Sequence, residues 1–336
     1  MIFGTPISWF LVEIFSIVLF LTAVNHAIKQ DSLFLKVLEL FGFVLGAAIF
    51  ENVGTNVVHT YYYDVRRIMM VGGVPLDILF IESVIWYAAF NLVKKLKVPI
   101  WVIPFAVGLF GSVQDMTIDP AAVFDTYALS TPVADAVNTT HPGALGDGIM
   151  SGQWNWTNPG YEGGFFGIPF YNYSGWMYLM FFYSAWILLL RWVYQKFNFK
   201  VVGYLYPFVA GVLQAFSFSN PISRYALFGT LDPAQSTYTG ELTMLCINFA
   251  IAIILLAVFW KRMGAIDMKK DGLILFGLPV IIHLYDIIYT FAMGTTVAYV
   301  PVLAVSAIHF AYLYLVYRKT RSLPLEGKQV SERQLT

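Results

Sequence analysis

Nine long runs of apolar residues follow one another along the chain, and they constrain its fold more than any other feature. A helix needs about 20 mostly apolar residues to cross the hydrocarbon core of a bilayer. The runs lie near residues 7–27, 33–50, 75–93, 98–114, 173–194, 201–219, 241–260, 272–291 and 297–317. Because the second is short and Gly277 and Pro279 break the eighth, eight crossings are the alternative count. The sequence predicts an all-α, polytopic membrane helix bundle of about nine transmembrane helices.

Composition supports the same conclusion. Hydrophobic residues make up 58% of the 336-residue chain and charged residues 12%, whereas soluble domains carry about 25% charged residues. A water-soluble globule of this size could not cover its surface with so few charges. The formal net charge of +0 gives no electrostatic support for nucleic acid as a partner. We expect an integral protein of the plasma membrane whose neighbours are membrane lipids.

Basic residues predict the orientation of the bundle. All but three of the 20 lysines and arginines lie in alternate connections or after the last apolar run; the exceptions are Arg66, Arg67 and Arg224. Positively charged loops mark the cytoplasmic side. The N-terminus is therefore expected outside and the C-terminus in the cytoplasm. We expect one transmembrane domain at 1–320 and a polar cytoplasmic tail at 321–336.

The longest connection, near 114–172, is predicted to lie outside the membrane. It contains no Lys or Arg. A loop of this length is usually functional or disordered. Trp154 and Trp156 argue against disorder from Trp154 onward.

Acidic residues beside the apolar runs are the first candidates for a functional site. Polar groups near membrane depth are costly and are often functional. Glu51, Glu82, Asp115 and Asp119 flank apolar runs on the predicted outer side. Water among the lipid headgroups would suffice to explain four other acidic residues: Asp64, Asp125, Asp135 and Asp147.

The spacing of Asp115 and Asp119 places both carboxyl groups on one face of a helix. Two close carboxylates oppose each other's ionisation, and apolar surroundings add to the effect. One of them could then remain protonated and donate a proton. The same spacing could instead hold Mg²⁺ for a diphosphate, or form a polar helix end that Pro120 terminates. Spacing alone leaves these three uses open.

Aromatic residues cluster on the predicted outer side, among them Tyr61, Tyr62, Tyr63, Trp154, Trp156 and Trp176. Interfacial Trp and Tyr belts are normal in membrane proteins, so most of these residues are expected to be belt or packing residues. Aromatic faces can also stabilise a carbocation in a dry pocket.

The histidines within apolar runs, His26, His283 and His309, are interpreted as hydrogen-bonded structural residues, with Asp286 three residues after His283. A retinal protein is disfavoured because no lysine lies in the middle of an apolar run.

Several motifs together resemble a known family. They are Asp119-Pro120, Trp154-Asn155-Trp156 and the run GIPFYNYSGW from Gly167 to Trp176. They are similar to motifs of the carotenoid biosynthesis membrane-protein family that includes the bacterioruberin-pathway and γ-carotene hydratases. Upstream, the Glu51-Asn52-Val53-Gly54 run, the tyrosines at 61–63 and Pro75 look like further positions of that family.

The resemblance covers roughly residues 45–195 and has two departures. The stretch 121–152 looks like an insertion. The expected F-G-x-Y element is replaced by the run from His59 to Tyr63.

The resemblance implies addition of water to a double bond at the end of a carotenoid, with no cofactor and no metal. Asp119 would be the acid, Asp115 would favour its protonated form, and Glu51 and Asn172 would position water. Trp154, Trp156 and Trp176 would line the wall around the cation. Further candidates for substrate binding are Tyr62, Glu82 and His59. The partner would be a lipophilic isoprenoid within the bilayer.

Three alternatives remain. A membrane prenyltransferase would use Asp115 and Asp119 to hold Mg²⁺ and a diphosphate, but a second aspartate-rich motif is absent from the sequence and these residues are predicted to lie outside. An isoprenoid cyclase would share the acid and the aromatic residues while excluding water. A transporter or lipid-binding protein would need a continuous polar path across the membrane.

Overall fold

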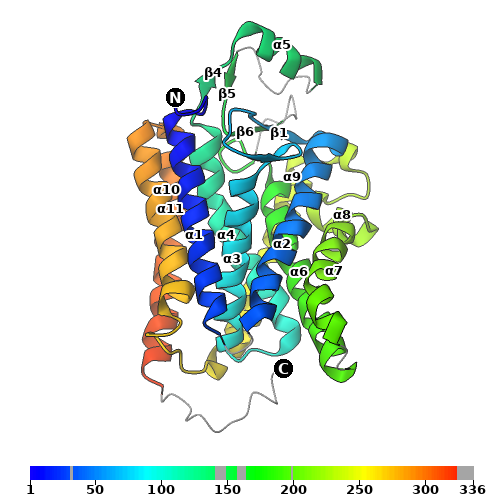
Figure 1. Cartoon of the computed structure of the whole chain (residues 1–336), viewed down its shortest axis with the longest axis vertical. Helices are drawn as coiled ribbons and strands as arrows, with labels where there is room; N and C mark the ends of the chain where they lie inside the picture. The colour runs from blue at the N-terminus through cyan, green and yellow to red at the C-terminus, as the bar shows by residue number, and fades with distance from the viewer. Residues whose placement is uncertain (31–32, 141–148, 157–163, 198–199, 324–336) are drawn as a thin grey trace.

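A bundle of helices forms the body of the molecule (Figure 1). The structure is a computed structural model, and it describes residues 1–30, 33–140, 149–156, 164–197 and 200–323. The tail from residue 324 onward and part of the expected insertion, at 141–148, lie outside the described residues.

Each of the nine predicted runs corresponds to a helix. These are α1 (Ile7–Ile28), α2 (Leu33–Val53), α3 (Leu76–Lys95), α4 (Ile103–Val123), α6 (Phe170–Phe197), α7 (Lys200–Ser217), α9 (Tyr238–Phe259), α10 (Leu278–Met293) and α11 (Thr296–Arg321). Within the described residues, eight helices are long and apolar enough to span a membrane. A ninth span results if α7 and α8 (Pro221–Phe228), which belong to a pair bent by 64°, form one broken crossing. The prediction of an all-α membrane bundle is confirmed.

Short helical turns adjoin several of these helices. A π-helical turn, Gly54–Val58, follows α2, and another, Leu273–Gly277, precedes α10. Turns of 3₁₀ helix lie at Ile100–Val102, Pro233–Gln235 and Trp260–Arg262.

The remaining elements form a cover at the end of the bundle where α1 begins (Figure 1). It includes α5 (Thr131–Thr140) and three antiparallel strand pairs. The pairs are β1 (Tyr61–Tyr63) with β6 (Trp154–Trp156), β2 (Met70–Val71) with β3 (Val74–Pro75), and β4 (Tyr127–Ala128) with β5 (Met150–Ser151). The β1–β6 pair joins two segments far apart in the sequence.

Helix α3 lies at the centre of the bundle. Its most apolar stretch is 83% buried, whereas that of α9 is 22% buried and faces outward. The indole of Trp86 on α3 donates to Ser184 on α6 over 3.0 Å. Small residues bring α2 and α7 together, because a Cβ at Gly42 would lie 2.4 Å from the carbonyl oxygen of Pro207.

Helix α4 extends beyond the apolar run near 98–114. The expectation that Pro120 stops the helix is wrong, because the helix continues to Val123. Proline removes one backbone donor, but neighbouring helices can compensate for that loss within a bundle. Asp115 and Asp119 therefore lie on a continuous helix among its neighbours and are buried.

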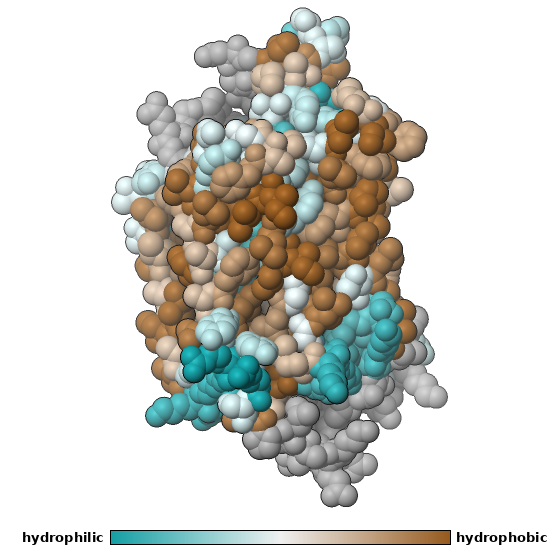
Figure 2. Space-filling view, turned by 90° about the vertical axis from the view of Figure 1, so that its left-hand side faces the viewer, coloured by the Kyte–Doolittle hydropathy of each residue, from teal (hydrophilic) through white to brown (hydrophobic). Residues whose placement is uncertain are grey.

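The outer surface matches an integral membrane protein. Figure 2 shows a broad hydrophobic belt on the side that carries α10 and α11, with strongly hydrophilic residues gathered near the end where α11 finishes. A belt of this kind needs a lipid environment, since soluble monomers rarely expose large continuous apolar patches.

Candidate functional site

Four buried carboxyl groups meet near the covered end of the bundle. Glu51 comes from the last turn of α2, Glu82 from α3, and Asp115 and Asp119 from α4. Their exposed fractions are 5%, 0%, 0% and 3%. They lie close enough for their charges to interact. The structure thus brings together the acidic residues that the sequence singled out on three different helices.

Two tyrosines of strand β1 hold Glu51. The hydroxyls of Tyr61 and Tyr63 donate to its Oε2 atom over 2.5 Å and 2.7 Å. Alternate residues of a strand face the same side, so both rings point toward Glu51. Burial and the neighbouring Glu51 raise the pKa of each hydroxyl above its usual range. Both tyrosines therefore remain proton-bearing donors across the physiological range.

Gly54 makes room for this contact. A Cβ at this position would lie 2.9 Å from the hydroxyl oxygen of Tyr61. The glycine in the Glu51-to-Gly54 run thus has a steric role, since a side chain there would push Tyr61 away from Glu51.

Glu82 has the carboxyl group of Glu51 as its neighbour. Neither carboxyl oxygen of Glu82 has a donor among the described residues. An ionised Glu82 would therefore be a buried charge without a hydrogen-bond donor, so its neutral form is favoured.

Asn172 holds the second carboxyl pair. Its Nδ2 atom donates to Asp115 Oδ2 over 2.7 Å and also to Asp119 Oδ2. The Oδ1 atom of Asp115 is buried with no partner among the described residues, and Asp119 lies beside it. The carboxyl groups of Asp115 and Asp119 do share one helix face, since one amide reaches both.

A turn before α6 positions Asn172. Gly167 adopts a left-handed backbone with φ +82°, which glycine tolerates without steric cost. Phe165 and Ile168 exchange backbone hydrogen bonds across this turn, and Pro169 directly precedes the helix. The GIP run therefore reverses the chain and directs the first turn of α6 toward α4.

The described residues place no basic side chain in an ion pair with these four carboxyl groups. Arg67, the buried arginine of the cover, pairs with Glu13 and Asp77 instead, over 3.0 Å and 2.9 Å. Burying an unpaired charge is very costly. The lack of a basic partner therefore favours protonated forms of these carboxyl groups.

The cluster borders a small cavity, which we call the carboxyl cavity. Measured as the space open to the centre of a water molecule, its volume is about 30 Å³. Five of its lining residues are polar: Glu51, Tyr61, Tyr63, Asp119 and Asn172. The others are Ile78, Ile81, Ile118, Trp154, Trp156 and Trp176. Acidic, amide and aromatic groups thus surround one space.

Cross-strand pairing places two of the tryptophans. Tyr61 is opposite Trp156 and Tyr63 is opposite Trp154, with ring centroids 5.0 Å and 5.8 Å apart. Such pairs stabilise a short ribbon. The same strand face therefore presents the Glu51 donors and the aromatic wall to the cavity.

The structure does not place three of the proposed substrate-binding residues, Tyr62, Glu82 and His59, in the lining of this cavity. Tyr62 faces the opposite side of β1, where its hydroxyl lies 3.4 Å from Ser151 Oγ and burial raises its pKa to about 12. His59 is exposed and has a left-handed backbone (φ 56°). Three consecutive tyrosines do not indicate which strand face meets Glu51, so the sequence alone does not identify Tyr61 and Tyr63 as its partners.

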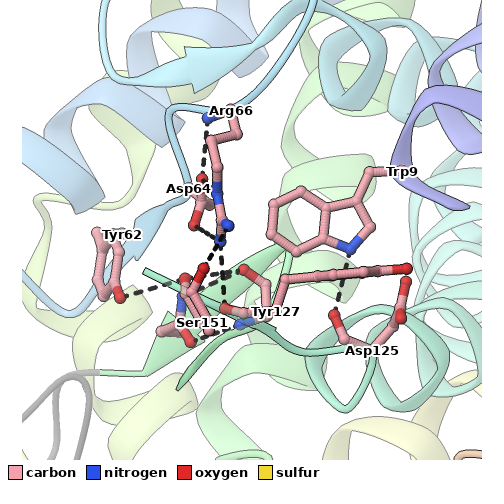
Figure 3. Close-up of polar contacts among 10 residues, drawn as sticks. Trp9, Tyr62, Asp64, Arg66, Asp125, Tyr127 and Ser151 are labelled. Atoms are coloured by element: carbon pink, nitrogen blue, oxygen red, sulfur yellow. Dashed lines mark hydrogen bonds and ion pairs between the residues drawn. The ribbon is translucent and has the colours of Figure 1, made fainter. Parts of the chain in front are cut away.

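Two acidic residues assigned to headgroup water are buried in the cover (Figure 3), and that assignment is wrong. The guanidinium of Arg66 donates two hydrogen bonds to the carboxylate of Asp64, over 2.9 Å and 2.8 Å. Asp125 accepts hydrogen bonds from Ser8, over 2.6 Å, and from Tyr289. Asp135 is exposed, as expected, and Asp147 lies outside the described residues.

These contacts fasten the cover to the bundle. Arg66 donates to the carbonyl oxygen of Ala128 over 2.9 Å, and its guanidinium carbon lies 5.1 Å from the ring centroid of Trp9. Trp9 in turn donates to the carbonyl oxygen of Asp125 over 3.2 Å (Figure 3). The described part of the expected 121–152 insertion is therefore attached to both α1 and the segment after β1.

The membrane histidines have hydrogen-bond partners. His283 and His309 contact each other over 2.6 Å, and His26 lies 2.9 Å from the hydroxyl of Tyr87. Within the described residues, no group of three or more His, Cys, Asp or Glu side chains is arranged to hold a metal ion.

Comparison with known proteins identified no similar protein. A scan of protein-family models, a search of curated proteins and a search of solved structures each found no match to this chain. Function must therefore be inferred from the side chains and their geometry.

Proposed function

We propose that this protein is a membrane enzyme that adds water to a terminal double bond of a carotenoid or related isoprenoid. One observation carries the proposal: one carboxyl group from each of two buried pairs, Glu51 and Asp119, lines a cavity walled by three tryptophans. Proton donors beside an aromatic surface suit a reaction that passes through a carbocation.

Asp119 is the proposed acid. It lines the carboxyl cavity, whereas Asp115 lies beside it and does not. The π electrons of the alkene form a C–H bond with the proton of Asp119, which leaves a carboxylate and a tertiary cation. Asn172 donates to both aspartates, so it stabilises the negative charge as it forms.

Water then captures the cation. Its oxygen forms the C–O bond, and its second proton returns to a carboxylate of the cluster, so the enzyme is regenerated. Glu51 also lines the cavity and accepts from two tyrosines, which suits it to orient the water. The reaction consumes only alkene and water and requires no cofactor or metal.

The three tryptophans in the cavity lining are proposed to stabilise the cation. Trp154, Trp156 and Trp176 offer aromatic faces to the cation, and a desolvated cation over such a face gains about 2 kcal/mol or more. A cavity of about 30 Å³ is smaller than an isoprenoid end. Substrate binding therefore requires some of these side chains to move.

We place the protein in the plasma membrane with its N-terminus outside and its C-terminus in the cytoplasm. In this orientation the proposed site lies toward the outside of the cell. Its support is the uneven distribution of lysine and arginine. The hydrophilic band in Figure 2 lies at the opposite end from the cover. A lipophilic substrate would reach the site from the outer leaflet.

Pigment analysis tests the proposal. Carotenoids are extracted from a carotenoid-producing host with the chain, without it, and with Asp119→Asn, and are compared by mass spectrometry. We expect a mass gain of one water per modified end with the native chain alone. Unchanged masses in all three cultures would refute the hydratase, and an isomer of unchanged mass but altered retention would indicate a cyclase.

A further inference from the structure

A second cavity lies directly beside the carboxyl cavity, between α1, α4 and α10. We call it the apolar cavity; its volume, measured in the same way, is also about 30 Å³. The two cavities share four lining residues: Ile78, Ile81, Ile118 and Trp154. These four side chains therefore form the boundary between the two spaces.

The lining of the apolar cavity is mostly hydrocarbon. Besides the four shared residues, it includes Val12, Phe15, Ala121, Ala122 and Ile282. Two of its polar lining residues make their hydrogen bonds to other side chains. Gln153 donates to Tyr289 over 3.0 Å, and Asp286 accepts from Thr117 over 2.7 Å. Apolar cavities in proteins stay dry and bind apolar molecules, so this space suits a hydrocarbon.

The contact between α1 and α10 separates the apolar cavity from the lipid. These two helices lie side by side (Figure 1). Phe15 of α1 stacks on Tyr285 of α10 with ring centroids 3.9 Å apart. Both residues line the apolar cavity and are half-buried. One part of each side chain thus faces the cavity while another part lies on the outer surface of the bundle.

The depth of this aromatic pair places it among lipid tails. Phe15 lies eight residues after Ile7, and Tyr285 lies eight residues before Met293, which are the helix ends nearest the cover. Eight residues correspond to about 12 Å along a helix axis. The hydrocarbon layer is about 30 Å thick, so the pair lies within it and not among the headgroups.

Packing alone holds the ring of Tyr285 in place. Its hydroxyl has no hydrogen-bond partner among the described residues. The ring packs against Phe15 and against Tyr289, whose ring centroid is 5.7 Å away. Moving the ring aside therefore breaks no hydrogen bond of the described structure.

We propose that the apolar cavity is the binding subsite for the hydrocarbon chain of the substrate, entered from the bilayer between Phe15 and Tyr285. The inference rests on the proposed hydratase function. It adds the class of substrate, a linear isoprenoid whose chain continues beyond the reacting double bond.

The position of the proposed acid explains why such a subsite is needed. When the terminal double bond lies beside Asp119, the rest of the chain must leave the carboxyl cavity, which is too small to hold it. The boundary of three isoleucines and Trp154 lets the chain do so without crossing the carboxyl groups of the cluster. Beyond that boundary, the chain would continue through the apolar cavity to the lipid.

Filling the cavity tests the subsite. Ala122→Val adds apolar volume at a residue that lines the apolar cavity and not the carboxyl cavity. Ala88→Val is the matched control, because Ala88 is equally buried and lines a separate cavity of about 10 Å³.

Opening the contact between α1 and α10 tests the entrance. Phe15→Ala removes bulk instead of adding it, so it serves even if the filled variants do not fold. Phe291→Ala is its control. Phe291 stacks on Tyr299 with ring centroids 4.3 Å apart, and it does not line the apolar cavity.

Binding is measured apart from turnover. The purified proteins in lipid nanodiscs are titrated with lycopene, an achiral linear carotenoid, and circular dichroism induced in its visible band reports binding in a chiral site. For Ala122→Val we expect the dissociation constant to rise by about tenfold, and for Ala88→Val we expect no change. In stopped-flow mixing, Phe15→Ala should raise the association rate and Phe291→Ala should leave it unchanged.

The outcomes separate the two proposals. If the native protein binds lycopene and Ala122→Val weakens binding, but no water is added, the hydratase function is refuted while the subsite stands. If Ala122→Val keeps the native affinity, the subsite is refuted, whether or not water is added. Absence of an induced signal from the native protein, or an equal loss of affinity in Ala88→Val, would also overturn the subsite. A native association rate in Phe15→Ala would refute the entrance.

Discussion

Asn172, in the first turn of α6, donates an amide hydrogen to the carboxyl group of Asp119 on α4. The same amide nitrogen reaches Asp115 over 2.7 Å. An amide cannot neutralise charge, but it can stabilise a carboxylate that appears after proton transfer. The contact is thus suited to a group that cycles between its acid and carboxylate forms.

Asp119→Asn should abolish turnover while the protein stays folded and membrane-inserted. The change keeps the size of the side chain and removes the transferable proton, and general acid catalysis is worth about 10²–10⁴-fold. Turnover of the purified variant is compared with that of Asp135→Asn, a change at an exposed residue of α5. Near-native water addition by Asp119→Asn would remove Asp119 as the acid.

Asn172→Ala should destabilise the protein as well as slow it. The change leaves buried oxygens of Asp115 and Asp119 without their amide donor, and an unsatisfied buried polar group costs about 1–3 kcal/mol. Thermal unfolding in detergent measures the loss. A variant as stable as the native protein would show that the observed contacts contribute little.

Tyr63→Phe and Tyr62→Phe form a matched pair on adjacent residues of β1. Tyr63 donates to buried Glu51 over 2.7 Å, so its loss should cost about 1–3 kcal/mol of unfolding free energy and reduce activity. Tyr62 lies on the opposite face of the strand, away from Glu51, so its loss should leave turnover much closer to the native value. Equal effects, measured by thermal unfolding and turnover, would contradict the strand alternation.

Excess chelator should leave activity unchanged. In the proposed reaction the carboxyl cluster supplies protons and binds no metal. Turnover is measured with and without a chelator, then after addition of Mg²⁺. Inactivation by the chelator with rescue by Mg²⁺ would favour a diphosphate-binding prenyltransferase.

Reporter fusions should define the orientation. Fusions after Lys97, Lys270 and the C-terminus should give cytoplasmic signals, and one near Asp135 should give an external signal, because basic loops stay in the cytoplasm. A cytoplasmic signal near Asp135 would reverse the topology and remove one argument against a prenyltransferase.

The helices could be predicted because apolar length alone specifies a crossing. The spacing of Asp115 and Asp119 likewise predicted a shared face, since that relationship is local to one helix. The pairing of Glu82 with Glu51 could not be predicted in the same way, because it depends on how α2 packs against α3. Helix α4 continues past Pro120, against expectation, because packing outweighs the local preference of proline.

The cover shows the same limit. Asp64 and Asp125 look like ordinary interfacial residues in the sequence, and their burial depends on partners elsewhere. Asp125 bonds to Ser8 and Tyr289, which are distant in the chain. Such contacts become visible only when the segments are brought together in three dimensions.

The pairing of β1 with β6 has a consequence for biosynthesis. Glu51 and Glu82 leave the ribosome well before Trp154 and Asn172, so α2 and α3 enter the membrane while the opposite wall of the site has yet to be translated. The side chains of Glu51 and Glu82 must stay protonated or hydrated until β6 and α6 are translated. Assembly of the carboxyl cavity is thus a late event, and chains that end before β6 should be targets for membrane quality control.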